Sequence, residues 1–334
     1  MRVAVLGGGS WGTALAKLLS ESDHRTTMWV HNPEVCATIN ERGENSVYLP
    51  GFPLPSSLRV TNDIGEALEG VDLAVYVSPS HVAREVMSSA RAVMPAGVPV
   101  VSASKGIEDG TLKRMSVVIA EALGRSDVST VASLSGPSFA REVAGGMPTA
   151  VTAAAVRREI AELVQKVFSG PTFRVYTSTD LVGVEIGGSV KNIIAIAAGV
   201  SDGLGYGSST RAALITRGAA ELSRLVTSLG GGARTVAGLS GVGDLVLTCT
   251  GDLSRNRSVG LRLGKGEKLA DILRDMRMVA EGVKNSKVVS ALAHHANVEL
   301  PIAEQVNMLL HDDKPARQVV GDLMARQTKA EIWG

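Results

Sequence analysis

Short apolar runs alternate with longer amphipathic stretches in the first half of the chain. The apolar runs have the length of strands and are rich in β-branched residues; they are Arg2–Leu6, Thr26–Val30, Asp72–Val77, Val98–Ala103, Val131–Leu134, Thr149–Ala153 and Phe173–Tyr176. Stretches with helical periodicity lie between several of them, at Trp11–Ser22, His81–Met94, Thr111–Leu123 and Arg157–Phe168. Because strands that alternate with helices pair into a parallel sheet covered on both faces, this pattern predicts an α/β domain.

The pattern changes after about residue 178, where the strand signal ends. Thr179 and Asp180 offer a helix start, and the glycines at 230–232 offer a helix stop. Helical periodicity dominates from there on, at Leu181–Val200, Ala212–Leu229, Lys268–Met276, Lys284–His295, Pro301–Leu310 and Pro315–Met324. A length of 334 residues also fits two domains. We therefore expect an α/β domain over residues 1–178 and an all-α domain over residues 179–334.

Charge and cysteine content narrow the class of protein. Lys and Arg number 34 against 33 Asp and Glu, a formal net charge of +1, which argues against broad capture of nucleic acid or an anionic membrane. The two cysteines, Cys36 and Cys249, have no metal-ligand spacing and build no disulfide framework, so we expect no metal and a reducing cytoplasm.

Two apolar segments resemble membrane signals but are poor examples of them. The apolar run at the N-terminus ends at Gly7, which is too early for the core of a signal peptide. The longest apolar stretch, Leu181–Val200, contains a glutamate, a lysine and an asparagine. Charged residues are costly in a bilayer, so this stretch is expected to be a buried helix of a soluble protein.

Three glycines directly after the first expected strand form the strongest local motif. Gly7, Gly9 and Gly12 have the spacing G-x-G-x-x-G and open an expected helix. Such glycines permit a tight turn, let the backbone approach a pyrophosphate, and allow close helix–strand packing. The free N–H groups at the start of the helix face the negative charge. The motif predicts a dinucleotide site; the alternative is a glycine-rich turn without a cofactor.

The end of the second strand bears on the choice between NAD and NADP. NAD-specific folds usually place Asp or Glu about 20 residues after the glycines, where it accepts bonds from the ribose 2′-hydroxyl. In this sequence that position is Asn32, preceded by His31. Without a repelling carboxylate a 2′-phosphate is tolerated, and a protonated His31 can pair with it. We therefore expect both cofactors to be used.

Polar clusters follow two more of the expected strands, where ligands of open α/β sheets bind. Lys105 lies in Ser-Ala-Ser-Lys-Gly after one strand and can meet the oxygens of a ligand; it can equally be a solvated loop residue. Gly136 and Ser138 lie in a segment that is expected to start a helix with Pro137 near its first position. The N–H groups there can hold a ligand or can simply be capped.

The second half contains ionisable residues in apolar surroundings. Lys191 lies inside an apolar helix, where it is either an edge residue that reaches water or a functional amine whose burial eases proton transfer. Asp244 and Thr248 are one helical turn apart, although an aspartate there can also be a helix cap. Arg255 and Asn256 are expected in a loop, where the guanidinium suits a phosphate but can also be a surface charge. A polar break at residues 279–282 can be merely a turn.

Taken together, these motifs resemble the bacterial NAD(P)-dependent glycerol-3-phosphate dehydrogenases. The resemblance runs in order from residue 2 to about 320, and it is carried by GGGSWGTALA at 7–16, SASKGI at 102–107, LSGPSFARE at 134–142, FRVYTSTD at 173–180, VKNIIAIAAG at 190–199, RAALITRG at 211–218, GVGDLVLTCT at 241–250 and SRNR at 254–257. One departure is Ser209, where the family pattern has asparagine.

The resemblance implies a Rossmann domain and a helical substrate domain with the active site in the cleft between them. It implies a cytoplasmic homodimer that interconverts sn-glycerol 3-phosphate and dihydroxyacetone phosphate with NAD(H) or NADP(H), and so supplies glycerol 3-phosphate for glycerophospholipid synthesis. By residue-to-residue matching, Lys191 is the catalytic base, with Asp244 and Lys105 as further catalytic residues. The substrate contacts are Lys105, Gly136, Ser138, Lys191, Asp244, Ser254, Arg255 and Asn256. The cofactor contacts are Gly7, Gly9, Ser10, Trp11, Gly12, His31, Lys105, Ala140, Arg255, Val279 and Glu281.

Two other functions fit the same glycine motif. The first is a related dehydrogenase of this two-domain plan that acts on another hydroxy acid and needs no phosphate. The second is a redox sensor that binds NAD(H) without turnover, which has no need to keep Lys191, Asp244 and Arg255 together.

Overall fold

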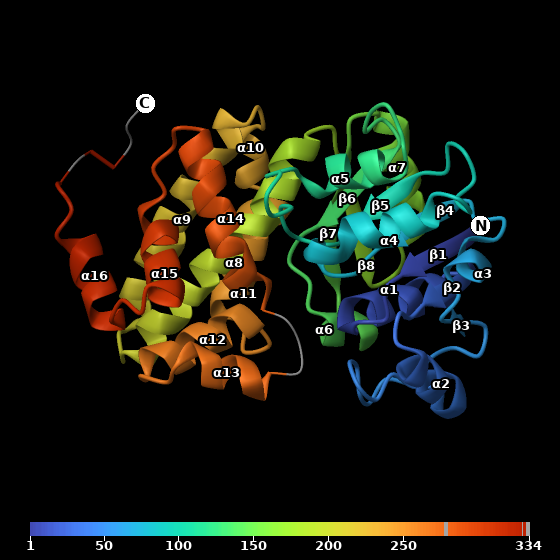
Figure 1. Cartoon of the computed structure of the whole chain (residues 1–334), viewed down its shortest axis with the longest axis horizontal. Coiled ribbons are helices and arrows are strands. Elements are labelled where there is room, and N and C mark those ends of the chain that lie inside the picture. The colour runs from blue at the N-terminus through green and yellow to red at the C-terminus, as the bar shows by residue number, and fades with distance from the viewer. Residues whose placement is uncertain (277–279, 329, 332–334) are drawn as a thin grey trace.

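The chain folds into a domain built on a β-sheet, followed by an all-helical domain beside it (Figure 1). The computed structural model describes residues 1–276, 280–328 and 330–331. The expected order of an α/β domain and an all-α domain is confirmed. The N-terminus lies on the sheet domain, and the last helix, α16 (Ala316–Met324), lies at the far end of the helical domain (Figure 1).

A single sheet organises the first domain. Its strands are β1 (Arg2–Leu6), β2 (Arg25–Trp29), β3 (Arg59–Thr61), β4 (Leu73–Tyr76), β5 (Val100–Ser102), β6 (Val131–Ser135), β7 (Thr149–Ala155) and β8 (Phe173–Ser178). They lie in the order β3-β2-β1-β4-β5-β6-β7-β8, and the first six pair in parallel in the order of a Rossmann fold. The expectation of an entirely parallel sheet is wrong at one place, because β7 pairs antiparallel to β6: the connection between them returns at the end of β6 and does not cross the sheet.

Side-chain alternation along the strands explains why helices cover both faces of this sheet. In β1, Val3 and Val5 join one apolar core, whereas Ala4 and Leu6 join another on the opposite face. The helices of this domain are α1 (Ser10–Glu21), α2 (Pro33–Arg42), α3 (Ile64–Leu68), α4 (Ala83–Ala90), α5 (Met115–Ala122), α6 (Ala140–Ala144) and α7 (Arg158–Phe168). Helices α1, α2, α6 and α7 contribute to the first core, and α3, α4 and α5 to the second.

Three elements of this domain did not emerge from the hydrophobic pattern. Strand β3 is three residues long and edges the sheet, and α3 spans five residues, so neither offers a full period. Helix α2 is mostly polar but carries clear end signals. The side chain of Asn32 accepts hydrogen bonds from Glu34 N at 2.8 Å and Val35 N at 3.1 Å, Pro33 occupies the first turn, and Gly43 closes the helix at φ 64°.

The described residues after β8 form helices and turns. The helices are α8 (Leu181–Gly203), α9 (Ser208–Ser228), α10 (Ala233–Val236), a π-helical turn (Leu239–Gly243), α11 (Asp244–Thr250), α12 (Arg255–Gly264), α13 (Leu269–Asp275), α14 (Glu281–His295), α15 (Pro301–His311) and α16 (Ala316–Met324). Asp180 caps α8, as expected, by accepting a bond from Gly183 N at 2.8 Å. Helix α8 has the length and hydropathy of a membrane span, but 89% of its most apolar window is buried inside the protein, so it is a core helix.

Helix α12 corrects the expectation that residues 254–257 form a loop. The hydroxyl of Ser254 accepts a hydrogen bond from Arg257 N at 3.2 Å and so caps the helix. The helix lies close against α8 because both carry glycines at the contact. A Cβ on Gly199 of α8 would come within 2.1 Å of Arg257 O, and one on Gly260 of α12 within 2.0 Å of Ile196 O.

Candidate active site

The turn between β1 and α1 forms an open cradle at the end of the sheet. A Cβ on Gly12 would lie 1.9 Å from Gly7 O, so glycine is required for the close approach of helix and strand. A Cβ on Gly9 would meet nothing within 4 Å, which leaves the backbone open to a ligand. Among the described side chains none caps the N-terminus of α1, while the hydroxyl of Ser10 donates to Tyr48 O at 2.5 Å. This donor set fits the pyrophosphate of a dinucleotide.

The residues expected to face the adenosine end of the cofactor lie at the end of β2. His31 is exposed and makes an edge-to-face contact with the Trp29 ring, with centroids 5.7 Å apart. Asn32, twenty positions after Gly12, uses its side chain to cap α2. No carboxylate therefore occupies that sequence position, and Trp11 in the first turn of α1 is half-buried against the sheet core.

Three charged side chains meet where the two domains contact each other. Lys191 of α8 donates to Asp244 Oδ1 at 2.6 Å, and Lys105, in the loop after β5, donates to Asp244 Oδ2 at 2.6 Å. Both Lys191 and Asp244 are buried, at 5% and 1% exposure, whereas the Lys105 side chain keeps 19%. The carboxylate thus lies between two ammonium groups, one from each domain. Such an arrangement has the composition of a proton-transfer site.

Two consecutive glycines in α8 allow this convergence. A Cβ on Gly188 would lie 3.3 Å from Lys105 Cγ, so the stem of that lysine runs directly across the helix. A Cβ on Gly187 would lie 2.8 Å from Ser240 O, in the π-helical turn that leads to Asp244. Larger residues at either position would move Lys105 or Asp244 away from Lys191.

The surroundings of Lys191 shift its proton affinity towards neutral pH. Burial lowers the pKa of Lys191, the nearby Asp244 raises it and Lys105 lowers it again, which together bring it to about 8. Burial raises the pKa of Asp244, but the two lysines lower it more strongly, so the carboxyl stays ionised. The amine can therefore exchange a proton near neutral pH while its partner remains an anion.

The loop after β6 contributes backbone groups next to Lys105. Gly136 O lies 3.5 Å from Lys105 Nζ and accepts a hydrogen bond from the Ser138 hydroxyl at 3.1 Å. Helix α6 begins at Ala140, so Pro137 lies in the loop before the N-cap residue Phe139, although it was expected near the first position of the helix. This segment therefore enters the cleft as a loop, with its N–H groups at the end of β6.

The start of α12 faces the same region from the helical domain. Asn256 is buried; it donates to Asn192 Oδ1 at 3.0 Å and accepts from Gly282 N at 3.0 Å. Arg255 is exposed at the first position of the helix; burial of part of its guanidinium lowers the pKa of the group, and the nearby Glu281 offsets only part of this shift. Ser254 is used as the helix cap.

The first residue of α14 connects the two domains. The carboxylate of Glu281 accepts a hydrogen bond from the Ser80 hydroxyl, after β4, at 3.1 Å. Lys284, one turn later, lies 3.4 Å from the ring of His81. Val279, the other expected cofactor contact in this segment, lies outside the described residues.

Two further polar residues, Thr248 and Asn192, lie beside Lys191 although they were not among the expected site residues. Thr248 Oγ1 accepts from Lys191 Nζ at 2.7 Å and donates to Asp244 O at 2.6 Å, so it fixes the amine from a third side. The spacing of one helical turn, noted in the sequence, already placed Thr248 on the same face of its helix as Asp244. Asn192 follows Lys191 directly and is buried, but a single buried amide carries no such signal.

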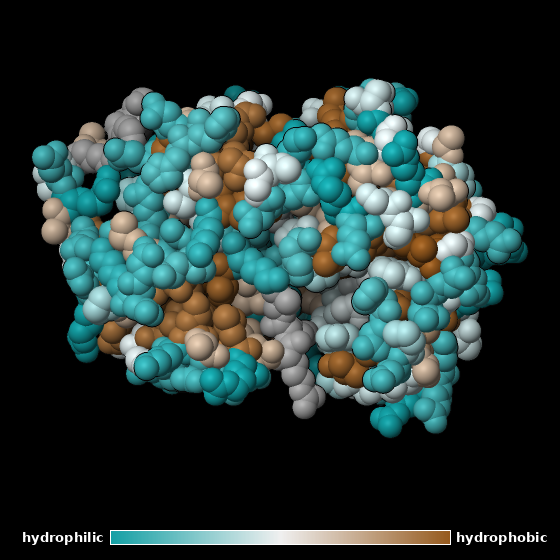
Figure 2. All heavy atoms as spheres, viewed as in Figure 1, coloured by the Kyte–Doolittle hydropathy of each residue, from teal (hydrophilic) through white to brown (hydrophobic). Residues whose placement is uncertain are grey.

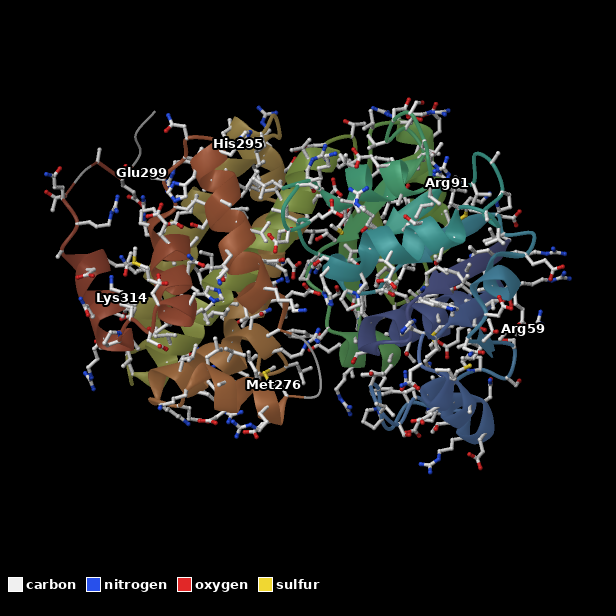
Figure 3. The ribbon with its side chains drawn as sticks, viewed as in Figure 1. Arg59, Arg91, Met276, His295, Glu299 and Lys314 are labelled. Atoms are coloured by element: carbon white, nitrogen blue, oxygen red, sulfur yellow. The ribbon has the colours of Figure 1, made fainter. Side chains whose placement is uncertain are left out.

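Several charged side chains lie far from this cluster. Figure 3 shows Arg59 at the outer end of the sheet domain and Lys314 at the outer side of the helical domain. Hydrophilic residues cover much of the face seen in Figure 2, with apolar patches between them. A cavity of about 600 Å³ lies near Arg2 and Arg25 at the start of the sheet strands, which is the end opposite the glycine turn.

Comparisons with known sequences cover nearly the whole chain. The profile of the N-terminus of NAD-dependent glycerol-3-phosphate dehydrogenase matches residues 2–161, and the profile of its C-terminus matches residues 180–321. Glycerol-3-phosphate dehydrogenase (NAD(P)+) of Geobacter sulfurreducens is 54% identical over 332 residues, 99% of each chain. The Myxococcus xanthus enzyme of the same name is 51% identical over 334 residues, 100% of each chain.

Solved structures agree with the sequence comparisons. The crystal structure of glycerol-3-phosphate dehydrogenase from Coxiella burnetii matches with a TM-score of 0.93 and 40% identity, covering 97% of this chain and 99% of that one. A D-mandelate dehydrogenase matches with a TM-score of 0.62 at 13% identity, which shows a shared fold alone. The chain belongs to the NAD-dependent glycerol-3-phosphate dehydrogenase family.

Proposed function

We propose that this chain interconverts sn-glycerol 3-phosphate and dihydroxyacetone phosphate, using Lys191 as the proton-transfer group. The observation that carries the proposal is the buried amine of Lys191, held at 2.6 Å from Asp244 and 2.7 Å from Thr248 at the cleft between the domains. A redox sensor that only binds NAD(H) has no use for a buried, charged amine at this cost in desolvation.

Oxidation removes a proton and a hydride from the substrate, and the two go to different acceptors. In oxidation, neutral Lys191 takes the proton of the C2 hydroxyl; in reduction, its ammonium form gives a proton to the ketone oxygen. Asp244 orients the amine and balances its charge, and Thr248 fixes its direction. A bound nicotinamide supplies the hydride chemistry.

Substrate positioning falls to residues on both sides of the cleft. Lys105 directs its ammonium group at the substrate oxygens, beside Gly136 and Ser138. Arg255 provides a bidentate donor for the phosphate at the start of α12, and Asn256 and Ser254 keep that helix start in place. With the phosphate held at Arg255, the reacting carbon C2 is placed near Lys191.

Residues of the first domain, with Glu281 of the second, fit the cofactor. The glycine turn with Ser10 and Trp11 would hold the pyrophosphate, and Ala140 and Glu281 would line the nicotinamide side. His31 would lie beside the adenosine ribose and admit NADP(H) as well as NAD(H).

A direct assay tests this function. Purified protein is mixed with NADH or NADPH and dihydroxyacetone phosphate, and the loss of reduced-cofactor absorbance is followed. We expect rapid loss that requires the phosphate, with no loss for dihydroxyacetone. Turnover of a non-phosphorylated 2-keto acid instead would support another hydroxy-acid dehydrogenase, and cofactor binding without turnover would support a sensor.

We also propose a division at residue 178, a cytoplasmic location, a homodimer and a role in supplying glycerol 3-phosphate for glycerophospholipid synthesis. The change from sheet to helix between Ser178 and Leu181 supports the division. Cys36 and Cys249 are free and buried, which supports a reducing compartment. Light scattering of the purified protein tests the dimer.

A further inference from the structure

A buried glutamate ties the helix that carries Lys191 to the opposite domain. Glu185 of α8 accepts hydrogen bonds from Ser116 N at 2.7 Å and from the Ser116 hydroxyl at 2.7 Å, and it also pairs with the guanidinium of Arg114. Its side chain is 4% exposed. These partners lie at the start of α5, a helix whose own N-cap residue, Arg114, makes no capping bond. The carboxylate of Glu185 therefore caps a helix of the other domain.

The residues that contact Glu185 lie at the C-terminal end of the loop that carries Lys105. This loop runs from the end of β5 to the start of α5, over residues 103–114. It is closed on itself by a bridge between Ile107 and Arg114 and by a hydrogen bond from Glu108 N to Lys113 O at 2.9 Å. A displacement of its end at Arg114 is therefore passed to its beginning near Lys105.

Both α8 and the loop of residues 103–114, which Glu185 joins, carry a residue of the Lys191–Asp244–Lys105 cluster. Lys191 lies six residues after Glu185, about 9 Å along α8. Lys105 lies across Gly188, halfway between them, and its ammonium contacts Asp244 at 2.6 Å. The position of the loop on α8 therefore sets how close the two lysines come to the same carboxylate.

We propose that Glu185 is a positioning residue for the reaction, because it holds the loop of Lys105 on the helix of Lys191. It touches none of the reacting atoms. It acts by fixing the geometry of Lys105 and Asp244 around the amine. This inference rests on the proposed function and adds a residue to it.

The helical domain contains a matched control. Glu221 of α9 is also buried, at 3% exposure, and it also caps another helix, accepting from Ile302 N at 2.7 Å and Ala303 N at 3.3 Å at the start of α15. Both partners of this contact belong to the same domain. Burial raises the pKa of Glu221 to about 7, so Glu221→Gln removes less charge than Glu185→Gln does. It makes the same substitution at a buried helix cap without touching the contact between loop and helix.

The experiment compares kcat and KM of the wild type, Glu185→Gln and Glu221→Gln in both directions. In Glu185→Gln an amide oxygen can still accept one bond, but the charge that holds Arg114 is lost. Because a misplacement of about 1 Å can cost up to 10²-fold in rate, we expect kcat to fall about tenfold while KM for the cofactor changes less than twofold. Glu221→Gln should keep wild-type kcat.

The pH profile separates positioning from a merely structural role. The charged groups that act on Lys191 are Asp244 on α11 and Lys105 on the loop, and Lys105 lowers the pKa of Lys191. If the loop moves away in Glu185→Gln, this repulsion weakens and the pH profile of oxidation shifts to higher pH. A loss of stability alone would lower the amount of active enzyme and leave the profile unchanged.

A second variant keeps the test valid if Glu185→Gln folds poorly. Arg114 is partly exposed, and Arg114→Gln removes the same ion pair from the loop side. We expect the same lower kcat and the same alkaline shift, and the double variant should lose less than the product of the single losses. Wild-type kcat and an unshifted profile in both single variants would overturn the inference. An inactive wild type would instead contradict the proposed function.

Discussion

The two halves of the active site present charge in different ways. The sheet domain offers the backbone of the turn around Gly9, which is open and needs no buried charge. The helical domain instead buries Lys191 and Asp244 almost completely, at 5% and 1% exposure. Backbone N–H groups at a helix start bind an anion without further cost, whereas a buried ion pair has to offset the desolvation of both groups.

This difference divides the work of catalysis. A preformed backbone cradle suits a cofactor that arrives and leaves unchanged in shape. A buried amine whose pKa is brought to about 8 suits a group that must gain and lose a proton in each turnover. Variants of the two halves should therefore affect different kinetic constants.

The largest effect is expected for Lys191→Met, which keeps the volume of the side chain and removes the amine. General acid–base catalysis contributes about 10²–10⁴-fold, so kcat should fall by that factor while cofactor binding, measured by calorimetry, stays near the wild-type value. The matched control is Lys314→Met, which removes a lysine paired with Asp322 at the outer side of the helical domain. Near-normal turnover in Lys191→Met would show that the amine is only structural.

Arg255→Ala tests the substrate side of the helical half. A lost charge-assisted contact costs about 1.5–3 kcal/mol, so kcat/KM for dihydroxyacetone phosphate should fall about 10- to 150-fold. Arg262→Ala serves as the control, because Arg262 lies on the same helix and pairs with Glu267 and Asp275. If Arg255→Ala uses the phosphorylated substrate as well as the wild type does, another residue anchors the phosphate.

Gly12→Ala tests the cradle. Its Cβ would lie 1.9 Å from Gly7 O, so the turn must shift and its N–H groups lose their alignment. We expect KM for the cofactor to rise about tenfold, with a smaller change in KM for the substrate. Gly321→Ala on α16, where a Cβ meets nothing within 4 Å, controls for the added methyl group. An unchanged KM for the cofactor would show that the glycine turn does not bind it.

The smallest effect is expected for His31→Asp at the end of β2. A carboxylate there accepts from a ribose hydroxyl and repels a 2′-phosphate, and an exposed charge contact is worth up to about 1 kcal/mol. The ratio of kcat/KM for NADPH to that for NADH should therefore fall about fivefold, whereas the neutral His31→Gln should change it less. Equal ratios in His31→Asp and the wild type would place the 2′-phosphate elsewhere.

The same difference between the halves explains what the sequence could reveal. The strands other than β3, the glycine turn and α8 are local patterns, so periodicity and spacing predicted them. The convergence of Lys105, Lys191 and Asp244 depends on tertiary structure. From the sequence, each residue had both a functional and a structural interpretation. Only the resemblance to a family assigned the three to one site. Their roles stay predictions, although the structure brings them together.

The errors also have local physical causes. Residues 254–257 were expected in a loop because the segment is polar, although Ser254 is a good helix cap and the glycine pairs Gly199/Gly203 and Gly260/Gly264 mark a close helix contact. The antiparallel strand β7 has the same composition as a parallel one. Nothing in a strand's own residues sets its direction; whether the connection crosses the sheet does.

The pH dependence of kcat/KM for glycerol 3-phosphate oxidation tests the central role of Lys191 most directly. The neutral amine is the base, and its pKa is about 8, so activity should rise with pH through about 8 and then level off. Lys105→Met removes one repelling charge and should move the midpoint to higher pH, on top of any loss in substrate binding. A profile that is flat between pH 7 and 9, or one that keeps its midpoint in Lys105→Met, would contradict a buried Lys191 as the proton-transfer group.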